Sequence, residues 1–91
     1  MNKTIKIIVS GRVQGVGFRW STKAVAEKLA IRGTVRNLPD GTVEIIAQSG
    51  EQRLSEFIQA IKAGPSTFAN VSQLKIEKLD NHHEYPTFRI I

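Results

Sequence analysis

GRVQGVGFRW, residues 11–20, places three glycines and two arginines in ten positions, between a run typical of a strand and a run typical of a helix. Before this stretch, residues 3–10 alternate apolar and polar side chains around Ile5, Ile7 and Val9, which predicts a strand with one buried face. After it, residues 18–30 repeat apolar side chains at helical spacing, which predicts a helix. The glycines therefore fall in a strand-to-helix turn.

The next part of the chain predicts a β-hairpin. Gly33 ends the connection from the helix, and residues 34–38 have the β-branched composition of a strand. Residues 39–41, Pro-Asp-Gly, form a tight turn in which the glycine is available for a positive φ. Residues 43–48 then return as the next strand.

A second helix has the clearest predicted boundaries. Ser49 and Gln52 have the spacing of a capping box at its start, and Gly64 followed by Pro65 ends it. One apolar stripe at helical spacing lies between these boundaries, formed by Leu54, Phe57, Ile58 and Ile61.

Strand signals resume at residues 71–79 and, after a polar turn, at residues 88–91. The resulting order, βαββαβ with a short last strand, predicts an α+β fold of the ferredoxin-like α/β sandwich type, with an antiparallel sheet and both helices on one face. Right-handed crossovers place the first and third strands at the centre. The predicted sheet order is therefore 4-1-3-2, plus a short C-terminal edge strand. We expect one domain over residues 1–91, because this length supplies a single core.

The composition is that of a basic, folded protein without cysteine. A net charge of +5 favours an anionic partner, such as nucleic acid, a lipid surface or a phosphorylated small molecule. Without cysteine there is no disulfide, no thiol nucleophile and no sulfur-ligated metal, which suits a reducing cytoplasm. The apolar stretch near the N-terminus is interrupted by Lys6 and is too short for a signal peptide or a membrane span.

The glycine turn has two features that favour an anion. Gly15 and Gly17 allow successive backbone N–H groups to converge into a concave nest. The following helix then carries Arg19 in its first turn and has no acidic residue before Glu27, whereas the second helix has Glu51 at its start. A cation at a helix N-terminus destabilises the helix by roughly 0.3–1 kcal/mol through its interaction with the helix dipole. A bound anion there would make the electrostatic interaction favourable. The turn is neither a Walker loop nor a dinucleotide fingerprint, since both need further residues that are missing.

Two stretches together, GRVQGVGFR at residues 11–19 and GTVRNLPDGTVEIIAQSG at residues 33–50, resemble the acylphosphatase family. Members of this family are small hydrolases that cleave the mixed anhydride of a carboxylic acid and phosphoric acid. The similarity extends over the whole chain and implies that Arg19 binds the phosphate and that Asn37 positions the attacking water. It also implies a phosphate-binding loop formed by Val13, Gln14, Gly15, Val16, Gly17 and Phe18. The family usually has a bulky apolar residue where this chain has Thr34, and Trp20 also departs from the commoner pattern.

The chemistry implied by this resemblance needs no metal and no cofactor. A carboxamide is not a general base near neutral pH, so Asn37 would orient a water in line with the phosphorus, and the proton would pass to a phosphate oxygen of the substrate. A carboxylate is a good leaving group, so positioning and electrostatic stabilisation suffice. We therefore expect an acyl phosphate as substrate, inorganic phosphate as product or inhibitor, and a monomeric enzyme with neither a nucleic-acid nor a membrane partner.

Two other functions share this fold. An RNA-binding module needs exposed aromatic residues on its central strands, and residues 5–10 and 43–48 contain none. A non-catalytic domain that binds an acyl or carbamoyl phosphate is the other alternative, like the first domain of a hydrogenase-maturation carbamoyltransferase. Because no further domain follows here, we expect a free-standing enzyme.

The remaining polar and aromatic residues carry no strong signal. His82 and His83 are neighbours in a polar turn, where we expect solvated side chains and no metal site. Phe18 and Trp20 are expected in the core. Arg12 and Arg36 fit a positive cleft and a soluble surface equally well.

Overall fold

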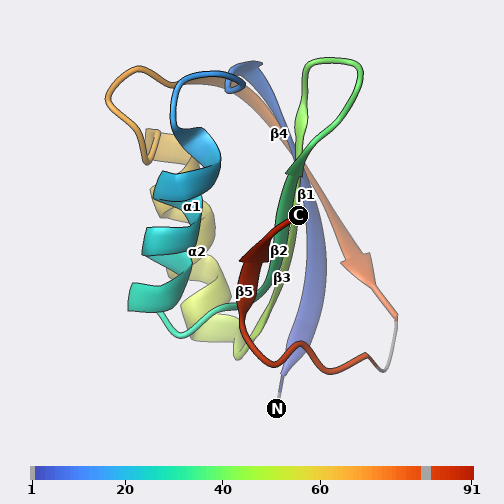
Figure 1. The fold of residues 1–91 in the computed structure, drawn as a ribbon. Helices are drawn as coiled ribbons and strands as arrows, with labels where there is room; N and C mark the ends of the chain where they lie inside the picture. The colour runs from blue at the N-terminus through green and yellow to red at the C-terminus, as the bar shows by residue number, and fades with distance from the viewer. Residues whose placement is uncertain (1, 81–82) are drawn as a thin grey trace.

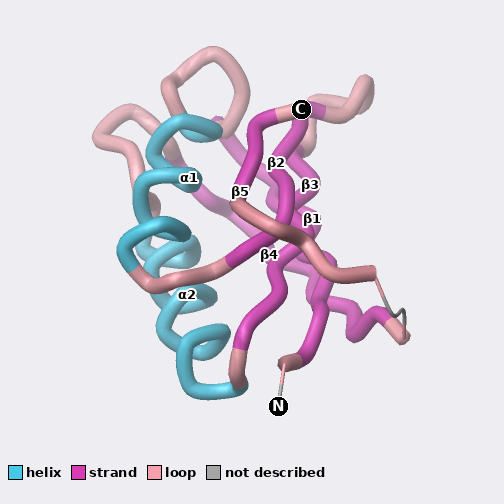
Figure 2. Tube along the Cα trace, turned by 60° about the horizontal axis from the view of Figure 1, so that its bottom comes forward, coloured by secondary structure: helices cyan, strands magenta, loops and turns pink. Residues whose placement is uncertain are grey.

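The computed structural model describes residues 2–80 and 83–91, and in them two helices cover one face of a five-stranded sheet (Figure 1). The sheet order, β4-β1-β3-β2-β5, confirms the predicted ferredoxin-like arrangement with its short C-terminal edge strand. Figure 2 shows the helices as one layer and the sheet as the other. The elements are β1 (Lys3–Arg12), α1 (Phe18–Lys28), β2 (Arg32–Asn37), β3 (Val43–Ser49), α2 (Glu51–Ala63), β4 (Asn70–Leu79) and β5 (Phe88–Ile90).

The core lies between the sheet and the helices. The alternation in β1 turns Ile7 and Val9 toward the helices, where both are fully buried. From the other layer, the predicted stripe of α2 buries Leu54, Phe57 and Ile61, and Phe57 meets Phe88 edge to face at 6.2 Å between ring centroids. Burying one such side chain contributes about 1.5–3 kcal/mol. This layer fixes α1 and α2 on the sheet.

β1 continues two residues farther than the alternating pattern indicates. Gly11 pairs with Val71 and Arg12 pairs with Asn70, beyond a shift of register between Ser10 and Gly11. The first two residues of the glycine stretch therefore belong to the strand, and the turn itself comprises residues 13–17.

The prediction that Gly33 ends a connection is wrong, because Gly33 is the second residue of β2. It pairs with Ala47 on one side and with Phe88 on the other. A Cβ atom at Gly33 would lie 1.8 Å from the carbonyl oxygen of Ile46, so the close approach of β3 requires glycine here. Thr34, the departure from the family pattern, is half-buried and pairs in register with Ile46.

The predicted capping box of α2 is also wrong. Ser49 pairs with Lys3 as the last residue of β3 and is buried, and its hydroxyl lies 3.5 Å from the carbonyl oxygen of Ala30. Gly50 is the N-cap instead, without a side-chain hydrogen bond. Ser49, which the local pattern assigns to the start of the helix, therefore belongs to β3 because it pairs with β1. The predicted end of the helix is confirmed, because Gly64 follows its last residue with φ 89°.

Trp20 does not lie in the core, contrary to the expectation. α1 buries Phe18, Thr22 and Ala26, which are four residues apart and share one face. Trp20 lies two residues after Phe18, on the other side of the helix, and 71% of its surface is exposed. Neither helix is long and apolar enough to cross a membrane, as far as the described residues go.

Candidate functional site

The loop of residues 13–17 and the β2–β3 turn lie at the same end of the sheet, the upper end in Figure 1. Gln14 connects them, because its Nε2 donates to the carbonyl oxygens of Leu38 and Thr42, both at 2.9 Å. Leu38 directly follows Asn37, and Thr42 directly precedes Val43, the strand partner of Asn37. The predicted loop is therefore fixed to the turn that follows the predicted catalytic asparagine.

A second contact holds the loop from the opposite side. The hydroxyl of Ser66, in the connection between α2 and β4, donates to the carbonyl oxygen of Val16 at 2.6 Å. Sequence reasoning missed this residue, and nothing in its local sequence marks it. Val13 and Phe18, at the two ends of the loop, are each 1% exposed and anchor it in the core. The backbone between them is thus held at both ends and from both sides.

Two glycines give the loop its course into α1. Gly15 has φ 72° and Gly17 has φ 77°, a left-handed conformation that costs glycine little and other residues more. Gly17 is also the N-cap of α1 and supplies no side-chain hydrogen bond. The first intrahelical bond runs from the N–H of Ser21 to the carbonyl of Gly17, so the earlier amides of the first turn have no acceptor within the helix. These N–H groups form an uncapped donor cluster, the kind of site that binds anions.

The charges around this helix start agree with an anion site. The first turn of α1 has no acidic residue, as predicted. Lys23 pairs with Glu27 at 2.7 Å, and Arg36 pairs with Glu44 at 3.0 Å, so both of these cations are locally compensated. Arg19 is half-buried and makes no hydrogen bond or ion pair within residues 2–80 and 83–91. Its guanidinium remains available at the N-terminus of α1.

Asn37 is the last residue of β2 and shares its face of the strand with Val35, which is buried under the helices. Its Oδ1 is a buried acceptor for which the described part of the chain provides no donor. Buried polar atoms in proteins almost always have a partner. Asn37 therefore has an acceptor oxygen without a partner at the end of β2, directly before Leu38, which accepts a hydrogen bond from Gln14 of the loop.

The other candidates from the sequence lie away from this arrangement. His82 lies outside the described residues. The side chain of His83 is exposed, as expected, and its carbonyl oxygen accepts a hydrogen bond from Gln48 at 2.7 Å. Arg12 is exposed at the end of β1. No group of three His, Asp or Glu side chains that could hold a metal ion occurs in the ranges that the structure covers.

Comparison with known proteins gives one consistent result. The family model described as Acylphosphatase matches residues 5–90. The chain is 45% identical to an acylphosphatase from Lactobacillus johnsonii over 98% of both chains. The crystal structure of acylphosphatase from Bacillus subtilis has a TM-score of 0.93 at 38% identity and covers 100% of this chain and 99% of that one. The structure of full-length HypF in its phosphate- and nucleotide-bound form has a TM-score of 0.88 at 26% identity, but the match covers only 12% of that chain.

Proposed function

Because the chain belongs to the acylphosphatase family, we propose that it hydrolyses an acyl phosphate to a carboxylate and inorganic phosphate at the loop of residues 13–18. Arg19 and Asn37 are the two catalytic side chains in this proposal. The observation that carries it is the hydrogen bond from Gln14 of the loop to Leu38, which ties the uncapped amides to the residue directly after Asn37, whose Oδ1 is buried without a donor.

The loop and Arg19 bind the phosphoryl group of the substrate. The uncapped amides at the start of α1 and the positive end of the helix dipole attract the dianion. The Arg19 guanidinium donates two parallel hydrogen bonds to phosphate oxygens, a geometry that a point charge cannot reproduce. Donors of this kind act most strongly on the charge of the transition state, and each is worth about 3–4 kcal/mol.

Asn37 orients the nucleophile. In this proposal the Asn37 side chain turns its Oδ1, which is buried and has no donor in this structure, toward a water. The water donates a hydrogen bond to it through one proton, which leaves a lone pair to point at the phosphorus. The amide does not accept the proton of the water, because it is not basic near neutral pH. That proton passes to a non-bridging phosphate oxygen as the P–O bond to the acyl group breaks. Alignment of this kind lowers the barrier by several kcal/mol, or about 10³-fold in rate.

The departing carboxylate takes the bonding electron pair without protonation, since it is a weak base. The reaction therefore needs neither a general acid nor a strong nucleophile from the protein, and phosphoryl transfer can depend on positioning and charge stabilisation alone. We extend the proposal to a monomer in a reducing cytoplasm, which suits a chain without cysteine.

A second candidate is that the same site binds an acyl or carbamoyl phosphate without turnover. The match to HypF, in which a region like this chain makes up 12% of a larger protein, is the observation that favours it. Turnover by the isolated chain distinguishes the two.

The test is a hydrolysis assay with purified protein and benzoyl phosphate, followed by absorbance, with inorganic phosphate as competitor. We expect turnover, competitive inhibition by phosphate, and the same rate after treatment with EDTA. Binding of phosphate without any turnover would favour the second candidate. Loss of activity with EDTA that returns on addition of a metal would exclude the proposed mechanism.

A further inference from the structure

Two aromatic side chains are exposed beside the proposed phosphate-binding loop. Phe68 is 75% exposed and Trp20 is 71% exposed, and no other large hydrophobic side chain in residues 2–80 and 83–91 is exposed as much. Single exposed apolar side chains are common on protein surfaces. Here, however, both side chains belong to segments that contact or continue the same loop. We call this pair of residues the aromatic rim.

Phe68 lies in the connection between α2 and β4, two residues after Ser66. The Ser66 hydroxyl donates to the carbonyl oxygen of Val16 at 2.6 Å and lies 3.9 Å from where a Cβ atom of Gly17 would be. The N–H of Ala69 donates to the carbonyl oxygen of Ser66 at 3.2 Å, so Phe68 is held in a closed turn. Figure 1 shows this connection next to the loop, at the upper end of the molecule. Phe68 is therefore exposed on the side of the loop that faces β4.

Trp20 approaches the same loop from α1. It is the third residue of the helix, directly after Arg19, and it lies on the face that points away from the core. The Cα–Cβ bonds of a helix tilt toward its N-terminus, so a side chain in the first turn covers the residues just before the helix. For Trp20 these residues are Gly17 and the rest of the loop. The indole is thus directed toward the end of α1 at which the phosphoryl group is proposed to bind.

The order of the strands decides on which side of the loop the acyl group leaves. β2, which ends at Asn37, and β4, which follows the segment of Phe68, lie on opposite sides of β1 in the sheet. In phosphoryl transfer the attacking and leaving oxygens lie roughly in line through the phosphorus. A water at Asn37 therefore directs the acyl group away from β2, toward the side on which Phe68 is exposed.

We propose that the aromatic rim of Phe68 and Trp20 binds the acyl group of the substrate, so that the chain selects acyl phosphates with an aromatic acyl group over acetyl phosphate. This inference rests on the proposed function, since it needs the phosphoryl group at the loop and the water at Asn37. Packing of one aromatic ring on another raises affinity roughly 2–10-fold. The rim binds the acyl group before and during the reaction alike, so its effect belongs in KM and not in kcat.

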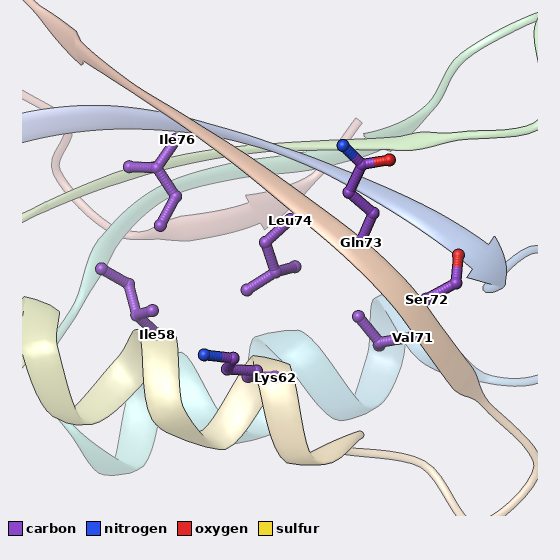
Figure 3. Close-up of a pocket in the computed structure, with 7 residues that line it drawn as sticks. All are labelled: Ile58, Lys62, Val71, Ser72, Gln73, Leu74 and Ile76. Atoms are coloured by element: carbon purple, nitrogen blue, oxygen red, sulfur yellow. The ribbon is translucent and has the colours of Figure 1, made fainter.

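A groove between β4 and α2, with a volume of about 290 Å³, supplies the matched control. Its lining includes Leu74 and Ile76, which point from β4 toward α2 in Figure 3. Ile76 is partly exposed, as the rim residues are. It lies six residues along the strand from Asn70, the first residue of β4, which is roughly 20 Å of extended chain. Ile76→Ala therefore removes an exposed apolar side chain at a distance from the loop.

Steady-state kinetics with benzoyl phosphate and acetyl phosphate test the rim. In Phe68→Ala and in Trp20→Ala we expect the KM for benzoyl phosphate to rise roughly 2–10-fold. The values of kcat, the KM for acetyl phosphate and the inhibition by inorganic phosphate should not change. Phe68→Tyr retains the ring and should keep the wild-type KM, and Ile76→Ala should leave both substrates unaffected. Equal changes for the two substrates, or an effect of Ile76→Ala as large as that of Phe68→Ala, would overturn the proposal.

Binding without turnover separates this inference from the proposed function. Benzylphosphonate and methylphosphonate carry the same anion with and without a ring, and calorimetry gives their affinities. We expect the wild type to prefer benzylphosphonate about tenfold, and Phe68→Ala to lose most of this preference. Trp20 is the one tryptophan of the chain, so its emission should respond to benzylphosphonate more than to methylphosphonate.

The two probes also distinguish the ways in which the proposals can fail. Equal affinity for both phosphonates, in a protein that hydrolyses acyl phosphates, would overturn the rim and leave the proposed function intact. Selective binding of benzylphosphonate without any turnover would contradict hydrolysis and support the rim. Binding of neither phosphonate would overturn both.

Discussion

The side chain of Gln14 donates to the carbonyl oxygen of Leu38 at 2.9 Å, and this bond ties the loop before α1 to the residue directly after Asn37. The same amide donates to Thr42 across the turn. One side chain thereby sets the distance between the proposed phosphate cradle and the proposed water-positioning residue.

Replacing Gln14 tests this positioning role. In Gln14→Ala the carbonyl oxygens of Leu38 and Thr42 lose a donor, which is expected to cost about 1–3 kcal/mol of stability. Turnover should fall more than phosphate affinity, because the loop amides remain while their alignment with Asn37 is lost. The measurements are kcat and phosphate inhibition at a temperature where the variant is folded. Ser66→Ala, which removes the other support of the loop, is the matched comparison. Unchanged kcat in Gln14→Ala would show that its contact is structural only.

Arg19→Lys is expected to keep the fold and to lose nearly all hydrolysis. The side chain makes no hydrogen bond or ion pair with the described residues, and an ammonium cannot replace a planar donor pair. We expect turnover to decrease by at least about 10²–10³-fold. Circular dichroism checks the fold, and Arg36→Lys is the control, since that guanidinium is already paired with Glu44. Near-normal turnover in Arg19→Lys would remove this residue from the site.

Asn37→Ala is expected to lower turnover while phosphate still binds. The substitution removes the acceptor for the attacking water but leaves the loop amides and Arg19 in place. Inhibition by inorganic phosphate gives the affinity, and kcat gives the effect on chemistry. A large loss of phosphate affinity would instead mean that Asn37 is part of the anion cradle.

The hydrogen bonds of Asp40 in the β2–β3 turn should make the free energy of unfolding depend slightly on pH. The hydroxyl of Thr42 donates to Asp40 Oδ1 at 2.6 Å and its backbone N–H donates at 3.0 Å, so the pKa of Asp40 lies below its usual 3.8. A lowered pKa in the folded state means that the charged form stabilises the fold above pH 3.8 and that this contribution is lost as the pH falls below it. We expect a smaller loss of stability on acidification in Asp40→Asn, measured by urea unfolding between neutral pH and acid. Identical pH profiles for the two proteins would contradict this account.

The sheet order and the helix layer could be predicted from the sequence, because the spacing of apolar residues indicates each strand and helix and the glycines mark turns between them. The errors at Gly33 and Ser49 have a common cause, since both depend on the pairing of strands that are distant in the sequence, whereas the error at Trp20 concerns which face of α1 is buried. Sheet pairing places Gly33 against Ile46 and keeps Ser49 in β3, and the buried face of α1 is set by Phe18.

In the candidate site, too, some features can be predicted from the sequence and others cannot. The motif around Arg19 is visible in the sequence, and so is the absence of acidic residues at the start of α1. The supports of the loop are not visible, because Gln14 and Ser66 act on residues 24 to 50 positions away along the chain. The roles of Arg19 and Asn37 remain predictions for the variants above.

The double support of the loop also bears on how activity returns when the unfolded chain refolds. Gln14 needs the finished hairpin and Ser66 needs the segment beyond α2, so early helices alone cannot assemble the cradle. Recovery of hydrolysis after dilution from denaturant should therefore follow the slowest tertiary event, and lag behind any rapid gain of helical signal.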